Sequence, residues 1–156
     1  MKVMTSRPEF DLSFATDFYD WAALDRRAAQ VVDVGGAKGH LALALSRRYG
    51  RLRLVVQDMA SVVDHLSSQD LEPGEDGTGA AGGVRFMPHD LFAPQTVRAD
   101  AYVFRWIFHN WPDKYCLSIL RAQIPVLRPG AKLIVQEAVM PEPGAHLARW
   151  RERDFR

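Results

Sequence analysis

Cysteine is scarce in this chain, and the scarcity limits its chemistry. Among 156 residues only Cys116 is a cysteine, so an internal disulfide and a zinc site built on cysteines are both excluded. Long apolar runs are missing as well. The longest, Leu41 to Leu45, has five residues, whereas a membrane-spanning helix needs about 20. Charged residues and a proline between Arg7 and Asp11 interrupt any signal-peptide core. We therefore expect a cytoplasmic protein without a membrane segment.

An excess of charge of either sign is missing too. Lys and Arg number 20 against 19 Asp and Glu, which leaves a net charge of +1. Dedicated nucleic-acid binders carry a broad basic excess, so we expect no nucleic-acid partner. Apolar residues make up 47% and charged residues 25% of the chain. At this length, such a composition is typical of one small globular domain.

Short apolar runs alternate along the chain with helical patterns. The runs predict five strands, at residues 31–34, 52–56, 84–87, 99–104 and 132–136. Because helices are expected between them, the pattern predicts an α/β fold with a parallel sheet built from right-handed crossovers. Ligands in such folds bind at the carboxyl ends of the strands. The residues at those ends are Gly35–Gly39, Asp58, Asp90, Arg105–His109 and Glu137.

Apolar spacing and capping residues place the helices. Residues 41–49 and 61–68 are expected to be helical, and Pro112 suits the first turn of a further helix. The buried face of that helix would hold Cys116, Leu120 and Ile124. Residues 145–156 resemble the start of another helix. Residues 70–83 hold five glycines, one proline and four acids without a basic residue, which predicts a flexible surface loop.

A glycine-rich segment follows the first expected strand. Gly35, Gly36 and Gly39 allow a sharp turn and a close approach of a ligand to the backbone, and Asp58 ends the next strand. An acid at that place accepts hydrogen bonds from ribose hydroxyls, so the pair favours a nucleoside-type site over a plain turn with a surface acid. The spacing is G-G-x-x-G rather than the dinucleotide pattern G-x-G-x-x-G. The P-loop pattern is also absent.

Several motifs together resemble one known family. They are VVDVGGAKG at residues 31–39, VQD at 56–58, HDLF at 89–92 and RWIFHNWPD at 105–113, with YDW at 19–21 and PEPG at 141–144. The chain is similar over roughly residues 19–144 to the S-adenosylmethionine (SAM)-dependent small-molecule O-methyltransferases of plants and fungi, and among these to the fungal secondary-metabolite type. The His-Asn-Trp-Pro-Asp block is the specific part of this likeness. The resemblance implies a Rossmann-like core with the strand order 3-2-1-4-5.

The resemblance also implies roles for individual residues. His109 would be the general base that takes a proton from the acceptor hydroxyl, and Glu137 would contact it. The other reading of His109 is a partly buried structural histidine. The cofactor SAM would be bound by Gly35, Gly36, Gly39, Asp58, Met59, Asp90, Leu91 and Arg105. Direct methyl transfer requires no metal. Trp106, Phe108 and Trp111 are expected in the core rather than as ligand platforms.

The chain departs from this family in extent. Family members carry an N-terminal helical domain that dimerises, and their catalytic domain continues with further helices and strands. We therefore expect residues 1–29 to be a remnant of, or linker to, a missing dimerisation domain, and residues 30–156 a partial methyltransferase domain truncated at its C-terminal end. The acceptor would be a hydroxyl of a small aromatic or polyketide-like metabolite, and a homodimer is possible in the full-length form. The alternatives are a non-catalytic SAM-binding or partner-binding remnant and a nicotinamide-dependent oxidoreductase, which the glycine spacing disfavours.

Overall fold

The computed structural model describes residues 11–64, 66 and 83–137. Five strands form its sheet: β1 (Gln30–Val34), β2 (Arg53–Asp58), β3 (Val84–Pro88), β4 (Ala101–Arg105) and β5 (Lys132–Gln136). All four pairings are parallel, and the order is β3-β2-β1-β4-β5. The α/β class and the expected strand order are therefore confirmed. The expected loop at residues 70–83 falls almost wholly, and the helix start at 145–156 wholly, outside the described residues.

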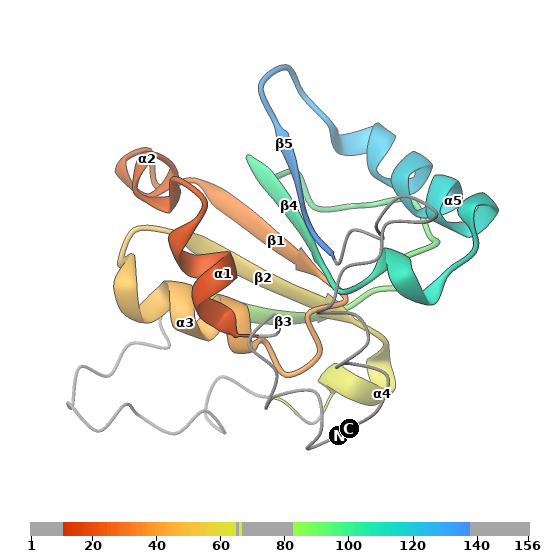
Figure 1. The fold of residues 1–156 in the computed structure, drawn as a ribbon, viewed down its shortest axis with the longest axis horizontal. Helices are drawn as coiled ribbons and strands as arrows, with labels where there is room; N and C mark the ends of the chain where they lie inside the picture. The colour runs from red at the N-terminus through yellow and green to blue at the C-terminus, as the bar shows by residue number, and fades with distance from the viewer. Residues whose placement is uncertain (1–10, 65, 67–82, 138–156) are drawn as a thin grey trace, which may run out of the picture.

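Helices cover both faces of the sheet (Figure 1). On one face lie α1 (Leu12–Asp17), α2 (Trp21–Arg26) and α3 (His40–Arg48), and α5 (Asp113–Gln123) lies on the other. Short elements complete the description: α4 (Ala60–Val63) and the 3₁₀ turns η2 (Phe108–Asn110) and η3 (Ile124–Val126). Helix α4 is shorter than the expected 61–68. No helix within the described ranges is long and apolar enough to span a membrane.

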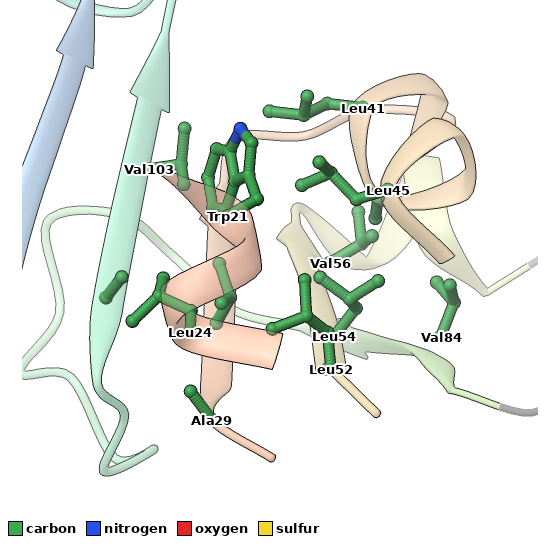
Figure 2. Close-up of a cluster of buried hydrophobic side chains, with 13 residues drawn as sticks. Trp21, Leu24, Ala29, Leu41, Leu45, Leu52, Leu54, Val56, Val84 and Val103 are labelled. Atoms are coloured by element: carbon green, nitrogen blue, oxygen red, sulfur yellow. The ribbon is translucent and has the colours of Figure 1, made fainter. Parts of the chain in front are cut away.

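The alternation of side chains along the central strands divides the core in two. Val31, Leu54 and Val56 belong to the first cluster, together with Trp21 and Leu45. Figure 2 shows Leu54 and Val56 on the side of the sheet that faces Leu45. Val32, Val34, Val55, Tyr102 and Phe104 belong to the second cluster, which includes Ile119 of α5. Strands buried on both faces read as continuous apolar runs, which is why the sequence located them well.

The bounds of β1 to β4 differ from the expected ones by one or two residues, and the buried face of α5 differs as well. Strand β4 spans Ala101–Arg105 rather than residues 99–104, and the Asp100 carboxylate just before it accepts the Gln30 N–H at 2.8 Å. The buried face of α5 was predicted wrongly. Ile124 is 63% exposed and Cys116 and Leu120 are half-buried, whereas Ile119, Ala122 and Gln123 are buried. The polar Gln123 is buried because its side chain is bonded to Gln95, so an apolar pattern could not find it.

Candidate active site

The glycine-rich loop between β1 and α3 lies directly on the sheet. The N–H groups of Gly35 and Gly36 both donate to the Gln57 carbonyl, at 2.7 and 3.2 Å. Gly35 and Gly39 have φ angles of 72° and 69°, which an L side chain rarely adopts. A Cβ on Gly36 would lie 2.6 Å from an Asp33 carboxylate oxygen. The glycines are therefore needed for the turn and for its close packing against the strands.

Asp58 ends β2 beneath this loop. One carboxylate oxygen accepts the Ala37 N–H at 2.9 Å, and the other accepts the N–H of Met59 at 2.8 Å. Each carboxylate oxygen has two lone pairs, so both keep a further site for a hydroxyl donor. The side chain that the sequence assigned to a ribose thus also ties the glycine loop to the end of β2.

A pocket of about 690 Å³ opens at the carboxyl ends of β1, β2 and β3. Five of the predicted cofactor residues line it: Gly35, Asp58, Met59, Asp90 and Leu91. Most of its remaining wall is apolar, and two aromatic residues, Phe92 and Trp111, pack edge to face at 4.8 Å beside it. Trp111 was expected in the core. It packs against the second core cluster and lines the pocket as well. A largely apolar pocket with a few acids suits a nucleoside-sized ligand.

Three of the predicted residues are not part of this wall. Gly36 and Gly39 shape the loop instead of lining the pocket. Arg105, at the end of β4, donates through Nε to the Gln136 side chain at 3.0 Å. Its guanidinium interacts with the carboxylate of Asp33.

His89 is a pocket residue that the sequence reading left without a role. Burial lowers the pKa of its imidazole, although the nearby Asp90 opposes the shift. Its Nε2 is buried and has no hydrogen-bond partner among the described residues. The neutral ring therefore adds an uncharged polar group to a wall that is mostly apolar and holds two acids, Asp58 and Asp90. Its position next to Asp90 in the HDLF motif was the sequence feature that could have placed it in the pocket.

Asp33 is a buried acid with a strongly raised pKa next to the glycine loop. It lies in β1 with 6% of its surface exposed. Burial raises the pKa of its carboxyl to about 7; the Arg105 guanidinium opposes that rise and the Asp58 carboxylate adds to it. Near neutral pH the glycine loop thus packs against a carboxyl group that is partly protonated. The sequence reading used Asp33 only as the start of the glycine motif.

His109 and Glu137 meet at the ends of β4 and β5. Nδ1 of His109 lies 2.9 Å from Glu137 Oε2, and Oε1 of the same carboxylate accepts the Phe108 N–H at 2.6 Å. An ionised carboxylate only accepts, so Nδ1 carries the proton and Nε2 is the nitrogen that can take another. The carboxylate orients the ring and stabilises an imidazolium. The structure thus brings together the two residues that the resemblance named.

Comparison with known proteins gives the family that the sequence motifs resemble. A family model described as an O-methyltransferase domain matches residues 15–154. The chain is 41% identical over 138 residues to the grayanic acid biosynthesis cluster O-methyltransferase of Cladonia grayi, an alignment that covers 88% of this chain and 29% of that protein. It is 45% identical over 129 residues to the O-methyltransferase pyvH of Aspergillus violaceofuscus, with 80% and 29% covered. The chain thus spans less than a third of the length of these relatives.

Solved structures agree with the fold. NcsB1, an O-methyltransferase from neocarzinostatin biosynthesis solved with SAM and 2-hydroxy-5-methyl naphthoic acid, is 31% identical with a TM-score of 0.69, covering 84% of this chain and 38% of that one. TnmH superposes with a TM-score of 0.74 at 22% identity, over 98% and 43% of the two chains, which supports the fold alone. The match of the family model over most of the chain and these alignments show that the chain belongs to the O-methyltransferase domain family.

Proposed function

We propose that this chain is the catalytic part of a SAM-dependent O-methyltransferase that acts on a hydroxyl of a small aromatic or polyketide-like metabolite. The observation that carries the proposal is the contact of His109 with Glu137 at the sheet edge where the nucleoside-sized pocket opens. The family membership, and the naphthoic acid bound by the neighbour NcsB1, support the choice of cofactor and acceptor class.

The pocket residues fit the cofactor. Asp58 would accept the ribose hydroxyls, Asp90 and Leu91 would lie at the adenine, and Met59 would cover it, while Gly35 brings the backbone close. Arg105 would act near the cofactor through its charge interaction with Asp33. When bound, SAM supplies a methyl group on a positively charged sulfur, which an oxygen nucleophile displaces.

His109 would provide the proton transfer that such a displacement needs. Its Nε2 takes the hydroxyl proton as the oxygen–methyl bond forms and the sulfur–methyl bond breaks. Glu137 holds the opposite nitrogen and balances the charge of the imidazolium. General-base catalysis of this kind contributes about 10²–10⁴-fold to a rate.

The fold alone does not decide between methyl transfer and other chemistry. A neighbour with a TM-score of 0.62 and 27% identity is described as a pericyclic reaction enzyme. A SAM-binding remnant without turnover is the second candidate, because the side chain of His109 is 39% exposed in this chain. A cytoplasmic location and a homodimer of a longer form stay predictions from the sequence.

The test separates binding from turnover. Calorimetry should detect SAM binding by the folded chain, and His109→Ala should keep that affinity while it lowers methyl transfer to a panel of phenols by about 10²–10⁴-fold. His40→Ala, at an exposed histidine at the start of α3, is the matched control and should leave the rate unchanged. No SAM binding at millimolar concentration would contradict the cofactor site. An unchanged rate in His109→Ala would contradict the role of the base.

A further inference from the structure

Trp106 has an unusual backbone conformation next to the proposed base. Its φ angle is 57°, in the left-handed region. Among the described residues, two others that are not glycine share this sign, Ala28 and Ala37, but both have small side chains. A bulky residue rarely adopts this conformation because its Cβ crowds the following carbonyl. Strain of this kind persists only where the surrounding contacts hold it, and it gathers at functional sites.

Both peptide groups of Trp106 are held in place. Its N–H donates to the Gln136 carbonyl at 3.0 Å, which extends the pairing of β4 with β5 by one residue. Its carbonyl accepts the side-chain N–H of Asn110 at 3.2 Å, across the turn that carries His109. The strained residue is thus fixed between the sheet and η2.

The turn at Trp106 also explains where its neighbour goes. Ile107 is 8% exposed and lies under the glycine loop, since a Cβ on Gly35 would come within 2.5 Å of its Cδ1. The indole ring of Trp106 meets the imidazole of His109 instead, with 5.6 Å between ring centroids and planes at 79°. The side chains of two consecutive residues therefore point to different places: Ile107 lies beneath the glycine loop, and Trp106 packs on His109.

The imidazole needs more than one contact to keep its orientation. The hydrogen bond from Nδ1 to Glu137 restrains one edge of the ring, but rotation about the Cβ–Cγ bond changes where Nε2 points. The ring of Trp106, packed nearly perpendicular to the imidazole, restricts that rotation by the edge-to-face packing of the two rings. Catalytic groups must be held within about 10–20° of their productive orientation.

We propose that Trp106 is a positioning residue for His109: its left-handed backbone turns the chain so that the indole ring holds the imidazole against Glu137. The inference rests on the proposed function for its catalytic meaning. Its structural part, an ordered His109 that depends on Trp106, holds or fails independently of methyl transfer.

Two variants at position 106 separate the effect of the strained backbone from the effect of the aromatic ring. Trp106→Ala removes the ring and keeps the strain, whereas Trp106→Gly removes both. We expect the glycine variant to have the higher melting temperature. At Ser118, an exposed position inside α5, the same pair should show the opposite order because glycine weakens a helix. An alanine variant that melts at or above the glycine variant at position 106 would overturn the strained-backbone part of the proposal.

Nitrogen NMR of the His109 ring tests the positioning without an assay of turnover. In the unaltered chain and in Trp106→Phe, which keeps an aromatic ring, we expect one tautomer with the proton on Nδ1. In Trp106→Ala and Trp106→Gly we expect exchange between tautomers. If neither small variant folds, Trp106→Leu keeps apolar bulk without an aromatic ring and is expected to show the same exchange. An unchanged His109 spectrum in the folded non-aromatic variants would overturn the proposal.

The kinetic readout connects the inference to the proposed function. Wherever methyl transfer is measurable, Trp106→Ala should lower kcat by about tenfold or more, while KM for SAM stays within twofold. A chain that binds no SAM would contradict the proposed function and leave the NMR result to decide the role of Trp106. Equal losses in kcat and SAM affinity would instead make Trp106 a general packing residue and contradict the proposal.

Discussion

Asp33 shows how burial changes the chemistry of a single residue. The pKa of its carboxyl is raised to about 7 in the folded chain, chiefly by burial, whereas an unfolded aspartate has a pKa of about 3.9. Between these values the unfolded chain releases a proton that the folded chain keeps. The free energy of unfolding therefore falls as the pH rises from about 4 to about 7.

Asp33→Asn should remove this pH dependence. The amide has the shape of the carboxyl group and carries no charge, so the variant should match the unaltered chain near pH 4 and exceed its stability by about 2–4 kcal/mol near pH 8. Denaturant unfolding at the two pH values measures the difference. Asp64→Asn, at an exposed carboxylate after α4, should leave the pH dependence unchanged. If the free energy of unfolding changed with pH in the same way for Asp33→Asn and the unaltered chain, the pKa of Asp33 would not be raised in the folded chain and the prediction would be wrong.

We expect Asp58 to support both the structure of the glycine loop and the affinity for SAM. Asp58→Ala leaves the N–H groups of Ala37 and Met59 without their acceptor and removes the proposed ribose contact. We expect SAM binding to weaken by about 1.5–3 kcal/mol, the scale of a hydrogen bond to a charged group. Calorimetry checks this, with Asp64→Ala as the control. An affinity equal to that of the unaltered chain would place the cofactor elsewhere.

At the residue scale, the family resemblance implied a contact between His109 and Glu137, and the structure brings the two side chains within 2.9 Å. Their catalytic roles stay predictions. The left-handed turn at Trp106 was not predictable, since its φ angle depends on contacts with Gln136 and Asn110 that only the folded chain brings together. The perturbed carboxyl of Asp33 likewise depends on burial by neighbouring strands.

At the scale of elements, the glycine loop and β2 depend on each other. Gly36→Ala should destabilise the chain by about 1–3 kcal/mol, because the new Cβ would lie 2.6 Å from Asp33 and 2.9 Å from Val56. Gly50→Ala is the matched control. No atom lies within 4 Å of its Cβ, so alanine there should stabilise the chain by about 0.4–1 kcal/mol. Thermal unfolding of the pair measures both effects. A Gly36→Ala variant as stable as Gly50→Ala would mean that the loop can lift off the sheet.

Helix α5 shows where an apolar pattern is insufficient. The expected stripe of Cys116, Leu120 and Ile124 follows a four-residue spacing, but the buried residues Ile119 and Gln123 lie one position away from it. Gln123 is buried because Gln95 donates to it at 3.3 Å, and Gln95 in turn exchanges two hydrogen bonds with Gln57 of β2. Three buried amides therefore orient α5 on the sheet. Nothing in the local sequence marks residues 38 positions apart as partners.

For the whole molecule, apolar runs located the strands, and the family resemblance implied their order, which the sheet confirms. The outer edge was less predictable. Strand β5 lies at the side of the sheet (Figure 1), and its Leu133 and Val135 are 40% and 51% exposed. These two side chains pair in register with the buried Tyr102 and Phe104 of β4. The row of apolar side chains that is buried on β4 therefore continues onto the edge strand β5, where the described residues leave it partly exposed.

This edge determines what the 156-residue chain should do by itself. The proposed cofactor pocket is lined by residues of β1 to β3 and the segments that follow them, so SAM binding should be measurable in the isolated chain. Methyl transfer should be slow, because the side chain of His109 is 39% exposed and water has access to the proposed base. Positioning and exclusion of water contribute several kcal/mol to such reactions. An exposed apolar edge strand also favours aggregation.

Expression of residues 1–156, followed by sedimentation and calorimetry, identifies a folded monomer that binds SAM before turnover on phenols is measured. Placing the same residues into the Cladonia grayi relative, where the aligned segment is 41% identical over 138 residues, should raise the rate, since we expect the rest of that longer protein to cover the exposed side of His109. His109→Ala in this chimera is the control for turnover by the transplanted base. Rapid methyl transfer by the isolated monomer would contradict the prediction, since it would require the chain to exclude water and position an acceptor with its own residues. A chimera that binds SAM but stays as slow as the isolated chain would show instead that the exposed side of His109 is not what limits the reaction.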